Sequence, residues 1–118
     1  MHVVLYQPQI PQNTGNIARL CAGTRVDLHL VGELGFSLSD RYLKRAGLDY
    51  WKHISLKEYE SWQDFFNAEN PDSKNLFFFS RFSNNCYFDA KFSNNSYLIF
   101  GNESSGLPEY LAKEFPEN

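Results

Sequence analysis

The chain has 118 residues, which suits one domain with a hydrophobic core and leaves little room for a second. Hydrophobic residues make up 42% and aromatic residues 17% of it, a composition that disfavours intrinsic disorder, a collagen helix and a coiled coil. The net charge of −3 is not that of a stand-alone nucleic-acid coat protein. Residues 1–53 carry six basic and four acidic side chains, and residues 54–118 carry five and ten, so a polyanion is expected to bind the first half.

Cysteine content and apolar runs bear on the compartment. Cys21 and Cys86 are the two cysteines, and no segment has the basic and apolar regions of a leader peptide, so free thiols in a reducing cytosol are expected. The longest apolar run, Leu76–Phe79, is far shorter than the roughly 20 residues that cross a bilayer. We therefore expect a cytoplasmic protein that does not enter the membrane.

Predicted strands and helices alternate along the chain. Runs of β-forming residues predict strands at residues 3–6, 28–31, 51–55, 76–79 and 97–100. Helices are predicted from Asn13, from Ser39 to Gly47, from a capping box at Ser55–Glu58 through Phe66, and over residues 108–115 behind Pro108. This alternation predicts an α/β fold with a mostly parallel sheet and helices on both faces.

The first predicted helix offers a candidate site. Its apolar stripe has the helical period and consists of Ile17, Leu20, Cys21 and Thr24. Asn13 or Thr14 is the expected cap, and Asn16 and Arg19 fall on the face opposite the stripe. An arginine held by an asparagine near a helix N-terminus can bind a phosphate or stabilise an oxyanion. The alternative is a solvated arginine on an amphipathic helix.

A second candidate is the loop after the last predicted strand, from Phe100 to Pro108. It joins a buried strand to a helix, which is where ligands bind in open α/β sheets. Gly101 and Gly106 allow close approach of the backbone, and Glu103 is the one charged residue of the loop. An ordinary strand-to-helix turn is the alternative.

Other sequence motifs, present or missing, narrow the range of possible functions. Neither a dinucleotide-binding glycine motif nor a phosphate-binding loop motif is present. His2, His29 and His53 lack metal-ligand spacing, so no metal is expected and His29 is interpreted as structural. One basic cluster is interleaved with aromatic residues, and this mixture suits phosphate contact and base stacking. The alternative is a solvated helix face. The basic members of the cluster are Arg41, Lys44, Arg45, Lys52 and His53.

Four segments in this order resemble the SPOUT methyltransferases, and most closely the small tRNA (cytidine(34)-2′-O)-methyltransferases. They are Tyr6–Cys21, Gly35–Phe36, Gly47–Tyr50 and Phe100–Pro108. The resemblance covers nearly the whole chain. It implies methylation of the wobble ribose, at cytidine or modified uridine 34 of leucine tRNAs, with S-adenosylmethionine as donor.

The resemblance also implies a deep trefoil knot and a homodimer with active sites near the subunit interface. Arg19 matches the residue that assists the ribose 2′-hydroxyl and holds its phosphate, and Asn16 would orient Arg19. The implied cofactor-binding residues are Phe79, Ser80, Gly101, Glu103, Gly106 and Leu107. The basic cluster described above supplies the expected tRNA contacts, which are Arg41, Lys44, Arg45 and Lys52.

The C-terminus departs from the family pattern. Members continue into another strand, a serine- and asparagine-rich loop and a helix that close the knot, whereas this chain ends at Asn118. The expectation is a single SPOUT domain over residues 1–118 that is incomplete at its C-terminus. The alternatives are a catalytically inactive RNA-binding fragment and a purely structural α/β domain, and saturable cofactor binding would distinguish the enzyme from both.

Overall fold

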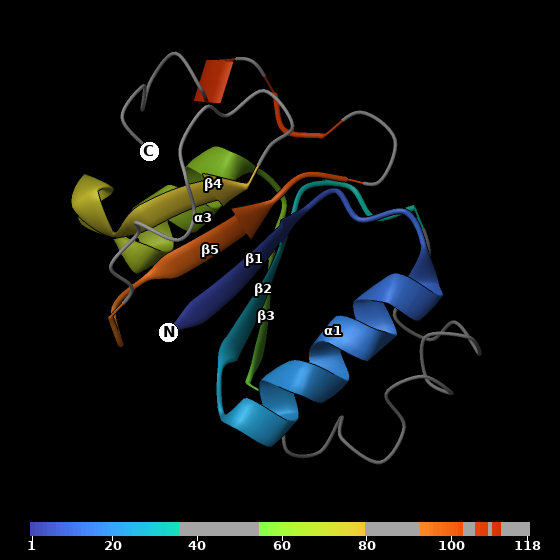
Figure 1. Cartoon of the computed structure of the whole chain (residues 1–118). Coiled ribbons are helices and arrows are strands. Elements are labelled where there is room, and N and C mark those ends of the chain that lie inside the picture. Colours follow the sequence, from blue (N-terminus) through green and yellow to red (C-terminus); the bar gives the residue numbers. More distant parts are fainter. Residues whose placement is uncertain (36–54, 80–92, 103–105, 109, 112–118) are drawn as a thin grey trace.

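The computed structural model describes residues 1–35, 55–79, 93–102, 106–108 and 110–111, arranged around one parallel β-sheet (Figure 1). The strands are β1 (His2–Tyr6), β2 (Asp27–Val31), β3 (Leu56–Tyr59), β4 (Leu76–Phe79) and β5 (Tyr97–Phe100). Their order is β3-β2-β1-β5-β4, and every pairing is parallel. The described residues also form the helices α1 (Pro11–Thr24) and α3 (Trp62–Glu69) and the short 3-10 helix η2 (Ser73–Asn75).

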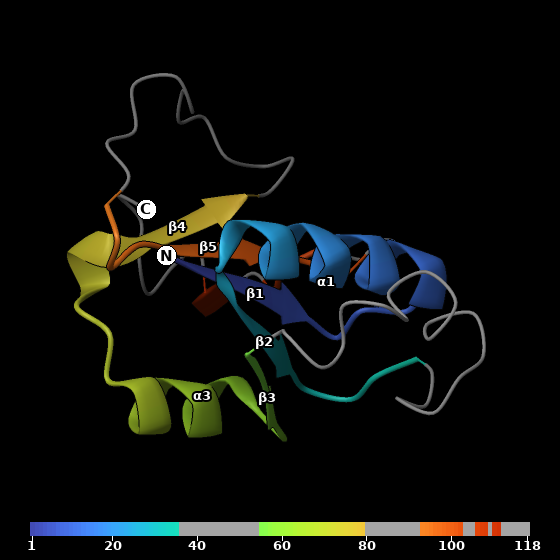
Figure 2. The same cartoon turned by 90° about the horizontal axis from the view of Figure 1, so that it is seen from below.

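The two α-helices lie on opposite faces of the sheet, as Figure 2 shows with α1 on one side and α3 on the other. The predicted α/β fold, a mostly parallel sheet with helices on both faces, is confirmed. Each face has its own core because side chains alternate along a strand. The core on the α3 face is built around Val4, Val31, Phe65, Leu76 and Ile99. The core on the α1 face consists of Leu5, Ala18, Cys21, Leu28 and Leu30.

Strand order reverses at β1, which decides where a ligand can bind. From β1 the chain builds β2 and β3 on one side, and then β4 and β5 on the other, with β5 returning to pair with β1. The connections that follow β1 and β5 therefore diverge at the carboxyl edge of the sheet. In open α/β sheets this point forms the ligand crevice.

Helix α1 differs from its prediction in start and in phase. It begins at Pro11, with Ile10 at the N-cap and no side-chain cap, so neither Asn13 nor Thr14 has that role. Proline suits the first turn of a helix because that turn leaves its N–H groups unpaired. The buried stripe is Thr14, Ala18 and Cys21, whereas Leu20 is 68% exposed. Small residues face the sheet, so the helix packs closely and the larger Leu20 points outward.

The helix predicted from Ser55 through Phe66 begins later in the structure. Residues Leu56–Tyr59 form β3 beside β2, where a capping box and a helix were predicted. Pairing with β2 satisfies the backbone of this segment and overrides its local helix signal. Helix α3 begins after Ser61, whose hydroxyl accepts a hydrogen bond from the Asp64 backbone N–H at 3.1 Å.

Several predictions fall on residues that the structure does not describe. The helix from Ser39 to Gly47 and most of the strand at 51–55 lie outside the described residues. Of the predicted helix at 108–115, residues 110 and 111 are helical and most of the others are not described. Among the described residues, no helix is both long and apolar enough to span a bilayer.

Replacing Ser61 tests the N-cap of α3. Ser61→Ala should lower the free energy of unfolding by about 1 kcal/mol, because the Asp64 N–H loses its acceptor. Urea unfolding measures the loss, and Ser61→Asp, which keeps an acceptor, should retain most of the stability. Equal losses in both variants would contradict the capping role.

Candidate functional site

A cavity of about 380 Å³ opens at the carboxyl edge of the sheet, where strand order reverses. Its walls come from β1, the first turns of α1 and the end of β5. The lining residues are Leu5, Pro8, Asn13, Thr14, Asn16, Ile17, Phe100 and Gly101. The two segments singled out from sequence, one after each of these strands, therefore meet in one cavity.

The α1 side of the cavity is polar. Thr14 is 1% exposed, and its hydroxyl has no hydrogen-bond partner among the described residues. Asn16 is exposed and lines the same space. The N-terminus of α1 adds the partial positive charge of its unpaired N–H groups. This wall can hold an oxygen-rich group such as a ribose hydroxyl or a phosphate.

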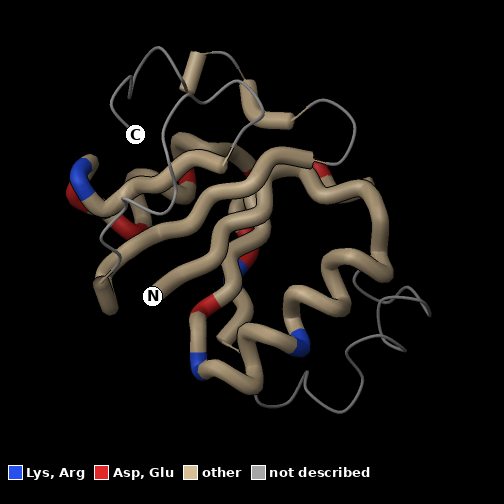
Figure 3. The backbone as a smooth tube through the Cα atoms, in the orientation of Figure 1, with Lys and Arg blue, Asp and Glu red and all other residues tan. Residues whose placement is uncertain are grey.

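Arg19 lies one helical turn beyond Asn16, is exposed and does not line the cavity. It is the single charged residue of α1, Arg25 follows just after the helix, and Asp27 lies two residues further on (Figure 3). The structure thus places Asn16 at the cavity and Arg19 on the exposed surface of α1, outside the cavity lining. A contact between the two residues stays a prediction.

The glycine loop after β5 closes tightly on itself. The Gly106 N–H donates to the Asn102 carbonyl at 3.1 Å, and the two residues form an antiparallel bridge. A Cβ on Gly101 would lie 2.2 Å from the Gly106 carbonyl carbon and 2.3 Å from the Leu107 nitrogen. Gly106 has φ +69°, a left-handed conformation that glycine adopts readily. Both glycines are therefore needed for the shape of the loop.

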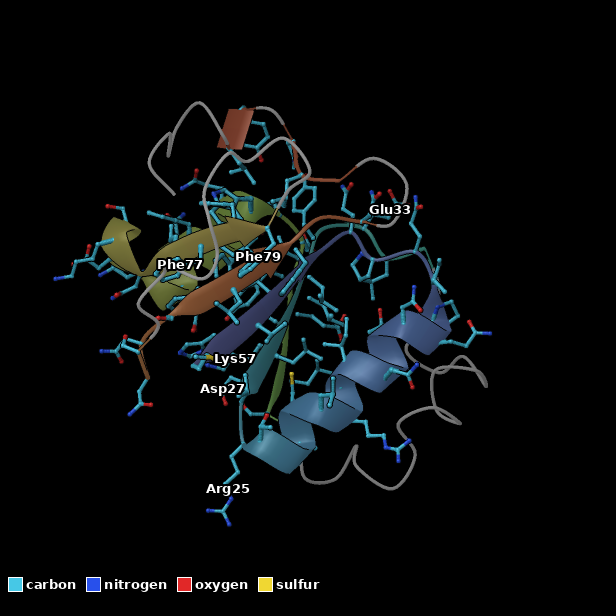
Figure 4. The ribbon with its side chains drawn as sticks, in the orientation of Figure 1. Arg25, Asp27, Glu33, Lys57, Phe77 and Phe79 are labelled. Carbon is cyan, nitrogen blue, oxygen red and sulfur yellow. The ribbon has the colours of Figure 1, made fainter. Side chains whose placement is uncertain are left out.

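Phe79, at the end of β4, stacks on Phe100 of β5 with ring centroids 4.8 Å apart and planes 14° apart. Figure 4 shows Phe79 on β4, near the carboxyl edge of the sheet. Leu107 packs against the core on the α3 face. Four of the predicted cofactor residues, Phe79, Gly101, Gly106 and Leu107, thus lie at or near the ends of β4 and β5. Ser80 and Glu103 lie outside the described residues.

The residues present fit a nucleoside cofactor in two respects. The stacked phenylalanines offer a partly exposed aromatic surface, and a Cβ on Gly106 would meet no atom within 4 Å, so space adjoins the loop. Among the described residues that line the cavity, none has a side chain that titrates near neutral pH. The described part of the site can therefore bind and orient groups, whereas a proton must leave through water or another residue.

The predicted tRNA contacts Arg41, Lys44, Arg45 and Lys52 lie outside the described residues. Cys21 is buried, and burial raises the pKa of its thiol to about 11, so it packs as an apolar residue.

Sequence reasoning missed two features. The first is the buried hydroxyl of Thr14, which lies in the segment that was singled out for Asn16 and Arg19. Its position two residues before Asn16 was the one signal in the sequence that could have indicated it. The structure also brings together His2 and His29, which come from different strands and show no motif spacing.

Comparisons with known proteins agree with this geometry. The SpoU rRNA methylase family model matches residues 1–118. A tRNA (cytidine(34)-2′-O)-methyltransferase of Burkholderia cenocepacia is 42% identical over 115 residues, which cover 98% of this chain and 74% of that protein. A solved structure described as giving insights into the 2-OH methylation of C/U34 on tRNA matches with TM-score 0.90 and 46% identity, over 97% of this chain and 74% of that chain.

The fold extends to more distant methyltransferases. An AdoMet-bound rRNA methyltransferase from Sinorhizobium meliloti superposes with TM-score 0.83 at 24% identity, over 96% of this chain and 43% of that one. The family match, the relatives above 40% identity and the parallel sheet with its glycine loop all agree. The chain belongs to the SpoU methylase family, within the SPOUT class of methyltransferases that its sequence resembles.

Proposed function

We propose that this chain methylates the ribose 2′-oxygen of nucleotide 34, cytidine or modified uridine, in leucine tRNAs, with S-adenosylmethionine as methyl donor. The main support is the solved structure described as concerning C/U34 methylation on tRNA, which is 46% identical over 97% of this chain. The cavity between β1 and β5 adds a polar wall suited to a ribose and its phosphate.

The cofactor supplies an electrophilic methyl group when it is bound. Phe79, Gly101, Gly106 and Leu107 would hold it at the ends of β4 and β5, together with Ser80 and Glu103. The AdoMet-bound rRNA methyltransferase of the same fold supports this assignment.

Positioning accounts for most of the expected catalysis, because methyl transfer requires the attacking oxygen in line with the methyl group. Arg19 stabilises the negative charge that develops on the ribose oxygen and holds the neighbouring phosphate, and Asn16 orients Arg19. Since the described cavity lining offers no titratable base, the hydroxyl proton leaves to water or to a residue elsewhere.

The active form is a homodimer, and residues 1–118 belong to one SPOUT domain in each subunit. Leu20, which is next to Arg19 on α1 and 68% exposed, would be covered if the second subunit packs on this helix. The relatives named above are longer than this chain. A tRNA substrate places the enzyme in the cytoplasm.

Calorimetric titration with S-adenosylmethionine and S-adenosylhomocysteine tests the cofactor assignment. The protein is compared with a version extended by the C-terminal segment of the Burkholderia cenocepacia relative. Saturable binding to the extended version supports the enzyme, and binding to neither version would favour a non-catalytic RNA-binding domain. Methyl transfer by the active form is then measured separately with leucine tRNAs and with other tRNAs, which tests the substrate range.

Gly101→Ala tests the glycine loop. Cofactor affinity should fall by roughly tenfold or more, because the added Cβ would displace the backbone of Gly106 and Leu107. Gly23→Ala is the matched control, since a Cβ at that exposed helical position meets nothing within 4 Å. Calorimetry measures both, and unchanged affinity in Gly101→Ala would remove the loop from the cofactor site.

Binding of tRNA should weaken steeply as salt rises, because phosphate contacts release counterions. Each of the substitutions Arg41→Ala, Lys44→Ala and Arg45→Ala should reduce the slope of log binding affinity against log salt concentration by about one. Filter binding over a salt series measures the slope. A tRNA affinity that does not change with salt concentration would contradict the prediction that the basic cluster contacts tRNA.

A further inference from the structure

A second polar cluster lies at the amino edge of the sheet, the edge opposite the cavity. His2 opens β1, His29 lies in β2 and Glu69 ends α3. All three side chains belong to the α3 face, where they are surrounded by aromatic rings. Figure 4 shows Asp27 and Lys57 near this edge, away from Glu33 at the carboxyl edge.

The potential ligand atoms converge. The His2 Nδ1 lies 3.0 Å from the His29 Nε2, and the Glu69 Oε1 lies 3.6 Å from the His29 Nε2 and 4.0 Å from the His2 Nδ1. The Asp27 Oδ2 is 3.5 Å from the His2 Nδ1. Tetrahedral zinc with bonds of about 2.0–2.1 Å holds its ligand atoms about 3.3 Å apart. To reach that spacing, the two separations that involve His29 change by about 0.3 Å and the separation of His2 from Glu69 by about 0.7 Å.

The protonation states suit a cation. Burial lowers the pKa of His29 to about 4, and burial also lowers the pKa of His2 despite the charge of Asp27. Both rings are therefore neutral at neutral pH. One of the two facing nitrogens donates to the other in the 3.0 Å hydrogen bond, so that ring must carry its proton on its other nitrogen for both facing lone pairs to bind a metal. Burial acts to raise the pKa of Glu69, but His29, Lys57 and the Tyr97 hydroxyl outweigh it and hold that pKa below its ordinary value.

Neighbouring groups orient the ligands. The Tyr97 hydroxyl donates to the Glu69 Oε1 at 3.1 Å, and the Tyr59 hydroxyl donates to the Oε2 at 3.3 Å. The His2 ring stacks on Tyr97 with centroids 4.1 Å apart. The Glu69 Oε1 keeps a second lone pair for a metal, because a carboxylate oxygen accepts more than one bond. Such outer contacts fix ligands in natural metal sites.

The cluster also has an entry path. A polar cavity of about 190 Å³ opens onto it, lined by His2, Glu69, Asn70, Pro71, Asp72, Asn75, Asn95 and Tyr97. The His2 side chain is 19% exposed, whereas His29 is fully buried. A hydrated cation can therefore reach the cluster from one side and keep a water molecule.

We propose that His2, His29 and Glu69 bind a divalent transition-metal ion of the zinc type, with Asp27 or a water molecule as the fourth ligand. The ion would join β1, β2 and α3 at the edge remote from the methyl-transfer site. This site is independent of the proposed function.

Zinc binding is measured on untagged, metal-free protein by competition with a chromophoric chelator. One zinc ion per chain is expected, and Glu69→Gln should weaken the affinity by more than about tenfold. That variant keeps the size of the side chain and an oxygen acceptor for one tyrosine hydroxyl, while its amide nitrogen can donate to the other. His2→Gln provides a second, partly exposed ligand loss. His53→Gln is the matched control and should bind zinc like the parent.

Two further readouts decide the outcome. Zinc should raise the melting temperature of the parent but not of Glu69→Gln, and cobalt should give the visible absorption of a four-coordinate site. Chelation by the Met1 amine and His2 alone would survive Glu69→Gln, so equal affinity in that variant overturns the proposal. Absence of saturable zinc binding to the parent overturns it as well.

Discussion

Arg19→Ala should reduce methyl transfer to nucleotide 34 by about 100-fold to 1000-fold while leaving cofactor affinity unchanged. Removing one preorganised donor from a developing oxyanion has an effect of this size. Arg19 is exposed on α1, one helical turn beyond the cavity residue Asn16, and it lies outside the cofactor loop, so its loss should act on the ribose and phosphate alone. Single-turnover transfer with labelled S-adenosylmethionine measures the rate, and calorimetry measures cofactor binding.

Two variants serve as controls for Arg19. Arg19→Lys keeps the charge but loses the planar fork, so we expect partial activity. Arg25→Asn removes the next basic residue, and asparagine tolerates the left-handed φ of 58° at that position. Arg25→Asn should retain full turnover. If Arg19→Ala itself keeps full turnover, Arg19 has no role in the chemistry.

Phe65→Ala should destabilise the domain by about 3–5 kcal/mol, the range observed for truncating a buried phenylalanine. Phe65 is fully buried on the α3 face and packs edge-on against Tyr59, Tyr97 and His29. Its removal would leave a cavity between α3 and the sheet. Since domains are stable by only about 5–15 kcal/mol, the loss should be visible in urea unfolding.

The neighbouring Phe66 is the matched control for Phe65, because it is half-buried at the margin of the same core. Phe66→Ala should lose clearly less stability than Phe65→Ala. Similar losses in the two variants would mean that α3 does not pack on the sheet through Phe65.

The sheet could be predicted because each of these strands is indicated by a short apolar run in the local sequence. The apolar runs at 3–6, 28–31, 76–79 and 97–100 all became strands, and alternation with helices indicated parallel pairing. The carboxyl edge followed from that topology, which is why Asn16 and Gly101 were both assigned to a site before their common cavity was seen.

The errors arose where tertiary contacts outweigh local signals. Leu20 completed a plausible apolar stripe, yet the smaller Thr14 and Ala18 face the sheet because only small residues allow α1 to approach it closely. The Ser55–Glu58 capping pattern yielded to pairing with β2.

The histidine cluster could not be predicted from spacing. His2, His29 and Glu69 lie on three elements, and only the parallel register of β1 with β2 brings the two rings together. A cluster of this kind has no sequence motif, so residue spacing could not indicate it. The expectation that no metal binds stays a prediction.

The most direct test of the account is to incubate the active form with labelled S-adenosylmethionine and leucine tRNA and to map the methylated nucleotide. We predict label on the 2′-oxygen of nucleotide 34, and none when that nucleotide carries a 2′-deoxyribose. Label on a base, or at another position of the tRNA, would contradict the proposed reaction.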